Sequence, residues 1–269
     1  MDLDTRNTLY DQAKKWIMEA GAIIKDQIGA PLEITTKSNP NDLVTTMDKN
    51  TEYFFVNRIK REFPNHLIIS EEGYGDDLKD LEGTVWIIDP IDGTMNFVHQ
   101  KRNFAISVGI YHDGIGEIGF IYDVMDDTLY SAKRGGGAYK NDFRLPTLPA
   151  DRKITESIIG MNHYWLCENR LVDETVMQHF IRTIRGTRLY GSAALELAYV
   201  AEGIIDGYIT MSLAPWDIAA GLIILDEAGG ISTNAWGADI NLLSTNSIVA
   251  CNPSIQSQII DDHLQKGRK

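Results

Sequence analysis

The sequence predicts a mixed α/β fold of the α+β type, because helical and strand patterns are grouped along the chain. Up to about residue 63, apolar side chains recur mainly at helical spacing. From about residue 85 to residue 132, apolar runs are separated by turns, which is typical of antiparallel strands. After about residue 157, strands and helices alternate. We expect one domain over residues 1–269, with an N-terminal αβ part of about residues 1–145 and a C-terminal αβ part of about residues 146–269.

The N-terminal part is expected to contain two helices, a polar loop or short hairpin, and five strands. The helices occupy about residues 9–28 and 46–63. The polar segment covers residues 34–44. The strands are expected at residues 67–70, 85–88, 104–111, 117–124 and 129–132. The glycine-rich residues 134–139 lie between strands, without a Lys-Ser/Thr pair or a helix start. We therefore interpret them as a turn with a bulge and not as a phosphate-binding loop.

The C-terminal part is expected to alternate four strands with four helices. The predicted strands cover residues 157–162, 188–191, 205–211 and 247–251. The predicted helices cover residues 168–184, 192–202, 216–228 and 254–264. Ser192 is a natural N-cap for the second of these helices, and Gly229-Gly230 closes the third.

Composition and charge exclude several classes of function. The chain is 43% hydrophobic and 23% charged, which is ordinary for a globular protein. A formal net charge of -13 argues against nonspecific binding to nucleic acid or anionic membranes. Cys167 and Cys251 form no CxxC motif, and the acidic first residues are unlike a signal peptide. No apolar run approaches the length of about 18 residues that a membrane-spanning helix needs. We expect a cytoplasmic protein with neither membrane nor nucleic-acid partners.

The most informative stretch is the apolar run of residues 85–88 and the polar turn after it. Such a run is typical of a strand buried on both faces, and here it leads directly into Asp89 and Asp92. Burying two carboxylates close together is costly unless a cation compensates their charge. Pro90 stiffens the turn between them, so both carboxylates and the Ile91 carbonyl can face one point. The following Gly-Thr pair permits a tight turn and caps a helix.

Two further acids stand in a similar position. Glu71 follows the strand of residues 67–70, and Asp217 opens the helix near residue 216. Taken alone, each of these acids is more typical of a helix cap or a solvated loop residue than of a metal ligand. If the four acids converge, their all-oxygen ligand set suits Mg²⁺ or Mn²⁺. The histidines do not pair at metal-ligand spacing and no G-x-S-x-G motif is present, so metal-activated water is favoured over a side-chain nucleophile.

Two long motifs carry a resemblance to a known family. Residues 86–97 (WIIDPIDGTMNF) and 215–221 (PWDIAAG) resemble the two signatures of the inositol monophosphatase family. Residues 37–48 and 71–72 match its intervening patterns in the same order. Phosphatases of the haloacid dehalogenase type are excluded, because their two aspartates are two residues apart and lie near the chain start. The resemblance implies a layered αβαβα fold and a Mg²⁺-dependent, lithium-sensitive phosphomonoesterase, commonly a homodimer, that acts on a small phosphorylated substrate.

The resemblance also implies a set of metal ligands. Glu71, Asp89 and the Ile91 carbonyl would hold a first Mg²⁺. Asp89, Asp92 and Asp217 would hold a second, and a third, weaker ion would lie near Glu71. The expectation is therefore two or three Mg²⁺ ions per subunit, with Mn²⁺ as a substitute.

The groups implied in water activation are Glu71 and Thr94, with Asp48 hydrogen-bonded to the Thr94 hydroxyl. Lys37 would lie near the metal site, although an ordinary solvated loop lysine is an equal alternative. The backbone N–H groups of Gly93 and Thr94 would bind phosphate oxygens.

Substrate choice is less determined than the reaction type. The expected substrate contacts are Asp92, Gly93, Thr94, Arg188, Gly191, Ser192, Ala193, Thr210 and Asp217. Animal relatives carry a ring-binding glutamate seven residues before the second-motif aspartate, where this chain has Thr210. Arg188 could contact a second anionic group of the substrate, and an ordinary surface arginine is an equal alternative. Inositol monophosphate is the first choice, and sugar phosphates, fructose 1,6-bisphosphate, nucleoside 3′,5′-bisphosphates and NADP(H) remain alternatives. An alternative of another class is a regulatory binding protein of this fold.

Overall fold

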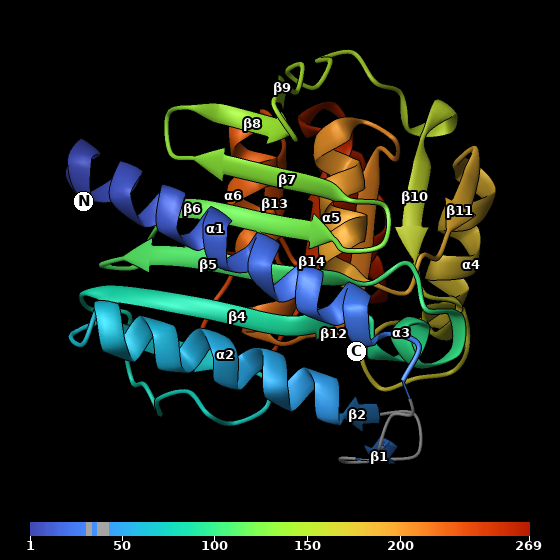
Figure 1. Ribbon diagram of the computed structural model, residues 1–269. Helices are drawn as coiled ribbons and strands as arrows, with labels where there is room; N and C mark the ends of the chain where they lie inside the picture. Colours follow the sequence, from blue (N-terminus) through green and yellow to red (C-terminus); the bar gives the residue numbers. More distant parts are fainter. Residues whose placement is uncertain (31–33, 37–42) are drawn as a thin grey trace.

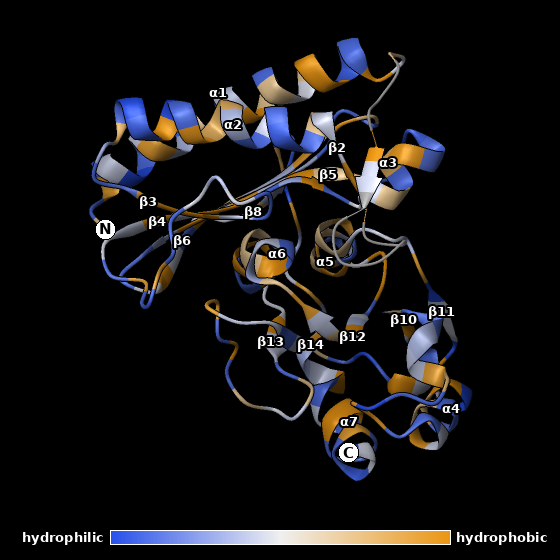
Figure 2. Ribbon diagram, turned by 90° about the horizontal axis from the view of Figure 1, so that it is seen from below, coloured by the Kyte–Doolittle hydropathy of each residue, from blue (hydrophilic) through white to orange (hydrophobic). Residues whose placement is uncertain are grey.

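The layers of the fold run helix, sheet, helix, sheet, helix, as Figure 2 shows from below. The computed structural model describes residues 1–30, 34–36 and 43–269. This architecture confirms the expected mixed fold with an αβαβα layer order.

The first sheet belongs to the N-terminal half of the chain. Its order is β3 (Leu67–Ser70), β4 (Thr84–Asp92), β5 (Ala105–His112), β6 (Ile115–Asp123), β7 (Thr128–Lys133), β8 (Gly137–Lys140) and β9 (Phe143–Arg144). β3 pairs with β4 in parallel and the later neighbours pair antiparallel. The predicted meander is confirmed, and residues 134–136 form a turn between β7 and β8.

Two long helices cover the outer face of this sheet (Figure 1). They are α1 (Leu3–Gln27), capped by Asp2, and α2 (Thr46–Glu62), capped by Thr45. Their apolar stripes pack on the sheet, with Trp16 of α1 and Phe55 of α2 in one core with Trp86 of β4. A short antiparallel pair, β1 (Ile34–Thr36) and β2 (Leu43–Thr45), precedes α2.

The second sheet belongs to the C-terminal half. Its order is β11 (Gly186–Arg188), β10 (Ile158–Met161), β12 (Gly207–Leu213), β14 (Asn246–Cys251) and β13 (Ile231–Thr233). β10 is parallel to β11 and β12, whereas β14 is antiparallel to β12 and β13. The short helices α4 (Glu174–Thr183) and α7 (Gln256–Ile260) cover its outer face.

The middle layer consists of α5 (Ala193–Glu202) and α6 (Pro215–Glu227), which lie between the sheets. Close packing of α6 depends on glycines in the first sheet. A Cβ atom added to Gly119 would lie 2.6 Å from the Ala220 carbonyl oxygen, and one at Gly109 would lie 3.0 Å from Ala219. Because helices lie on both sides of the first sheet, β4 is buried on both faces. Trp86 packs toward α1 and α2, and Ile87 packs toward the middle layer.

Several elements differ from the sequence expectations. α1 begins at Leu3 and not near residue 9, residues 137–139 of the expected turn belong to β8, and β13 was not expected. α4 begins at Glu174 and not at residue 168, because Asp173 caps it and Asn169 accepts the N–H groups of Leu171 and Val172 in a turn. The strand expected at residues 188–191 lies at Gly186–Arg188. The last helix is broken into η3 (Pro253–Ile255), α7 and η4 (Leu264–Gly267).

The remaining short elements are two 3₁₀ turns beside β10 and a helix after β4. They are η1 (Ile154–Glu156), η2 (His163–Leu166) and α3 (Thr94–Gln100). Among the helices of the described ranges, none combines the length and apolarity that crossing a membrane requires.

Candidate active site

The site begins where the pairing of β4 with β5 shifts its register. Asp89 pairs with Ser107 and Asp92 with Ala105, so the register shifts between the two aspartates. The Ile91 N–H donates to the Asp89 carboxylate at 3.0 Å, which fixes this turn. Gly93 follows with φ +90, a left-handed conformation that favours glycine. Both aspartates are nearly inaccessible, with exposures of 2% and 6%.

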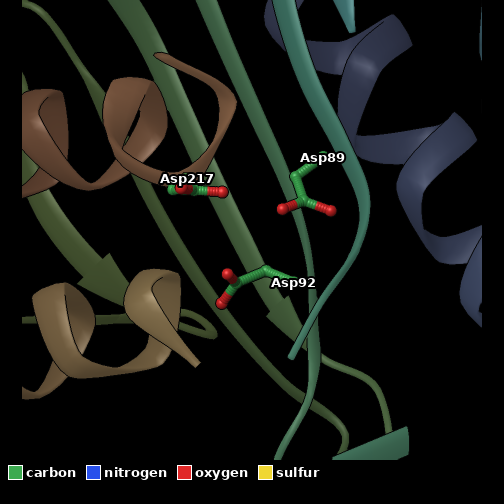
Figure 3. A group of neighbouring side chains, drawn as sticks. All are labelled: Asp89, Asp92 and Asp217. Carbon is green, nitrogen blue, oxygen red and sulfur yellow. The ribbon is translucent and has the colours of Figure 1, made fainter. Parts of the chain in front are cut away.

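Asp217 reaches the same point from the middle layer. It lies in the first turn of α6, where its Oδ2 atom accepts the Ala214 N–H at 2.8 Å. One carboxylate oxygen each of Asp89, Asp92 and Asp217 lies within 4.8 Å of the other two. Figure 3 shows the three side chains pointing toward one another from β4 and α6. The structure thus brings together residues more than 120 positions apart in the sequence.

The electrostatics of this acidic cluster favour a cation. Burial, then the charges of Glu71, Asp92 and Asp217, raises the pKa of the Asp89 carboxyl well above its usual value. Burial likewise raises the pKa of Asp92 to about 6, against the opposing hydrogen bonds from Ser192 and Ala194. The charge of Glu71 acts on both Asp89 and Asp92, which places Glu71 beside the cluster. Converging hard oxygen donors with suppressed ionisation fit Mg²⁺ or Mn²⁺.

A second buried carboxylate holds Thr94. Asp48 accepts the Thr94 hydroxyl at 3.1 Å and also caps α2 by accepting the Thr45 N–H at 2.9 Å. Thr94 Oγ1 lies 3.1 Å from the Ile91 carbonyl oxygen as well. Burial raises the pKa of Asp48 above its ordinary value. The expected Asp48–Thr94 hydrogen bond is therefore present in the structure.

The turn before α5 is bound to Asp92. The Ser192 hydroxyl donates to Asp92 Oδ2, and the Ala194 N–H donates to the same oxygen at 2.9 Å. Gly191 has φ +80, and Ala193 follows as the first helical residue of α5. Ser192 is the N-cap, as the sequence predicts. The start of α5 and the end of β4 are thus joined through one carboxylate.

The other expected contacts vary in position. Thr210 is buried on β12, two residues after Tyr208. Arg188 is exposed, and its guanidinium donates to the neighbouring Thr187 carbonyl at 2.8 Å. Lys37 lies outside the described residues. Their roles remain predictions.

Sequence reasoning missed three buried groups near the site. The carboxyl of Glu196 accepts the Tyr190 and Gly191 N–H groups, and burial raises its pKa to about 7. Tyr208 lies near enough to Glu196, Asp92 and Asp217 for their charges to raise its pKa, although burial has the larger effect. The Glu52 carboxylate accepts hydrogen bonds from residues on both sides of Glu71 in the chain. Tyr208 could have been found from its place two residues before Thr210 on the same strand face. Glu196 stands in a nearly apolar helix, a pattern that indicates burial, whereas no sequence pattern distinguishes Glu52 from a surface residue.

This geometry agrees with comparisons to known proteins. A model of the inositol monophosphatase family matches residues 5–267 of the chain. The chain belongs to the inositol monophosphatase family. An inositol-1-monophosphatase of Bacillus subtilis is 56% identical over 252 residues, which cover 94% of this chain and 95% of that protein. The present family member is therefore an inositol monophosphatase-like phosphatase.

Solved and curated relatives extend this likeness. The staphylococcal protein SaIMPase-II, solved with bound inositol monophosphate, superposes on this family member with a TM-score of 0.87, 42% identity, and coverage of 96% of this chain and 94% of that one. Its complex with 2′AMP gives a TM-score of 0.88, 44% identity, and coverage of 96% and 95%. The Nus factor SuhB of Escherichia coli is 35% identical over 243 residues, or 88% of each chain.

Metal binding is expected to release protons. Since the raised pKa values mean that the folded chain holds protons more tightly than the unfolded chain, the cation-free protein loses stability as the pH rises from 3.8 to about 6. A cation that displaces those protons restores this stability. We expect the Mg²⁺-induced rise in Tm to be larger at about pH 8 than at about pH 5.5. Titration calorimetry in two buffers of different ionisation enthalpy measures the number of protons released when Mg²⁺ binds. Equal Mg²⁺-induced Tm shifts at both pH values would contradict binding of Mg²⁺ to these protonated carboxyls.

Proposed function

We propose that this family member is a Mg²⁺-dependent phosphomonoesterase that hydrolyses inositol monophosphate with an activated water. The observation that carries the proposal is the convergence of Asp89, Asp92 and Asp217 on one point, with suppressed ionisation. The relatives that carry inositol-1-monophosphatase activity in their names, or inositol monophosphate in their crystals, support the substrate.

Five groups would hold the ions. They are the carboxylates of Glu71, Asp89, Asp92 and Asp217 and the Ile91 carbonyl, for two or three Mg²⁺ ions per subunit, with Mn²⁺ as a substitute. Bound Mg²⁺ would supply Lewis acidity toward the phosphate ester and a lowered pKa for the attacking water. The single proton of the Thr94 hydroxyl is donated to Asp48, so the lone pairs of the Ile91 carbonyl oxygen would be available to a metal ion.

The chain's own groups would orient the water and the phosphate. The Thr94 hydroxyl donates a hydrogen bond to Asp48, so the lone pairs of the Thr94 oxygen would be available to accept a hydrogen bond from the attacking water. Glu71, beside Asp89, would take the proton released by the attacking water. The N–H groups of Gly93 and Thr94 would bind phosphate oxygens, and Lys37 would approach the same charge.

The substrate's organic part would lie against Gly191, Ser192, Ala193 and Thr210, with Arg188 at the rim. Ser192 donates its proton to Asp92, so its lone pairs remain for a ring hydroxyl donor. Thr210 supplies one neutral hydrogen-bonding group where animal relatives have a carboxylate, which admits substrates other than inositol phosphates.

A nucleotide is the second candidate substrate. The relative solved with 2′AMP supports it, as does the neutral Thr210. Fructose 1,6-bisphosphate, nucleoside 3′,5′-bisphosphates and NADP(H) complete the set to be tested. A homodimer in the cytoplasm is part of the proposal; the E. coli relative named a Nus factor supports a regulatory role as the alternative.

Phosphate release from these substrates tests the function. We expect release with Mg²⁺, none with EDTA, and inhibition by Li⁺, with the highest kcat/KM for inositol 1-phosphate. A higher kcat/KM for 2′AMP would change the proposed substrate from inositol monophosphate to a nucleotide, and the proposed reaction would stay the same. Failure to hydrolyse any of these phosphomonoesters in Mg²⁺ would overturn the enzyme proposal and favour the regulatory role.

A further inference from the structure

Glu52 of α2 is a fully buried glutamate to which the proposed reaction assigns no role. Its exposure is 0%, and it lies one helical turn after Asp48. Residues four apart lie on the same face of a helix, so both carboxylates face the first sheet. Burial of a carboxylate is costly unless hydrogen bonds compensate for the lost water. The donors that compensate Glu52 therefore indicate what this residue does.

The donors come from the segment that contains Glu71. Glu52 Oε1 accepts the Ser70 hydroxyl at 2.7 Å and the Tyr74 N–H at 2.8 Å. Glu52 Oε2 accepts the Glu72 N–H at 2.6 Å. Ser70 and Glu72 are the immediate neighbours of Glu71 in the chain. Glu52 therefore holds the Ser70 side chain before Glu71 and the backbone N–H groups that follow it.

We propose that Glu52 is a positioning residue that holds Glu71 in place beside the acidic cluster. This inference rests on the proposed function. The chain leaves β3 at Ser70 and turns through Gly73, which has φ +88, so no strand pairing fixes residues 71–74. Glu52 restrains this segment through the three hydrogen bonds that it accepts. Because Asp48 on the same helix holds Thr94, α2 sets the distance between the two groups proposed to orient the water.

Three variants separate positioning from general loop stability and from charge. Glu52→Gln has nearly the same shape, but its amide group cannot accept at both oxygen positions, so at least one donor is lost. Glu52→Asp keeps the charge and loses the reach. Lys60→Met is the matched control, because Lys60 holds the far end of the same segment by pairing with Asp76 at 2.7 Å.

The measurement is Mn²⁺ affinity of the substrate-free protein, by calorimetry or electron paramagnetic resonance. We expect the Kd for Mn²⁺ to rise about 10- to 100-fold in Glu52→Gln and Glu52→Asp, the range seen when a group supporting a metal ligand is removed. Lys60→Met lowers Tm and keeps the wild-type Kd. If the Glu52 variants do not fold by circular dichroism, Ser70→Ala removes a single donor and is expected to raise the Kd in the same direction.

Several results would overturn the inference. A wild-type Kd for Mn²⁺ in Glu52→Gln would do so. A wild-type Kd in Glu52→Asp would also do so, because it would reduce the role of Glu52 to charge alone. The third such result is a Kd that rises as much in Lys60→Met as in the Glu52 variants. Absence of Mn²⁺ binding to the wild-type protein would overturn it together with the metal site. Mn²⁺ binding without phosphate release would count against the proposed reaction alone, because the affinity comparison needs no turnover.

Discussion

Replacement of Asp92 by asparagine is expected to abolish phosphate release while the protein remains folded. An asparagine oxygen can still accept the Ala194 N–H and the Ser192 hydroxyl that Asp92 Oδ2 accepts. Its amide group then faces Asp89 and Asp217 and cannot bind a cation. Metal ions contribute several kcal/mol to such reactions, so kcat should fall by on the order of a thousandfold.

Asp123→Asn is the matched control for Asp92→Asn. Asp123 is 2% exposed, burial raises its pKa to about 6, and it pairs through Ala105 at the same level of the sheet as Asp92. It lies outside the acidic cluster. We expect near-wild-type kcat in this variant, measured by phosphate release with circular dichroism as the folding check. Near-wild-type activity in Asp92→Asn would show that the cluster is not the metal site.

Gly119→Ala is expected to have a large effect on stability. The added methyl carbon would lie 2.6 Å from the Ala220 carbonyl oxygen and 3.2 Å from Ile223 Cβ, so α6 must move away from β6. Overpacking of this kind costs about 1–3 kcal/mol. Because Asp217 lies in the first turn of α6, the movement should also weaken Mg²⁺ binding. Urea unfolding and a Mg²⁺ titration measure the two effects.

The control for Gly119→Ala is Gly29→Ala after α1. A Cβ atom at Gly29 meets nothing within 4 Å, so the free energy of unfolding should change by less than about 0.5 kcal/mol. An unchanged free energy of unfolding in Gly119→Ala would mean that α6 does not depend on this close approach.

Local patterns predicted most of the fold and the centre of the acidic cluster. The apolar run before Asp89 predicts a strand buried on both faces, and β4 is such a strand. Pro90 and Gly93 predict the turn that directs Asp89 and Asp92 to one point. Whether Asp217 joins them depends on how α6 packs between two sheets, which no local pattern specifies. The family resemblance supplied that part.

The sequence did not reveal the supporting groups, because burial of a polar side chain is a tertiary property. Glu52 follows Asp48 on a helix rich in charged residues, where a glutamate is typical of a solvated face. Glu196 lies between the buried residues Leu195 and Leu197 of its helix, and one of its two carboxylate oxygens accepts N–H groups of the turn before the helix. The start of α4 was misplaced for a related reason, since side-chain hydrogen bonds of Asn169 compete with helix formation there.

Anomalous diffraction from crystals soaked in Mn²⁺ tests the central claim most directly, namely that Asp89, Asp92 and Asp217 bind the cations that activate water. The account predicts at least one anomalous peak about 2.0–2.3 Å from carboxylate oxygens of these aspartates, at distances typical of hard cations, and its loss in Asp92→Asn crystals. Mn²⁺ peaks only elsewhere in the wild-type protein, or an unchanged peak in Asp92→Asn, would contradict it.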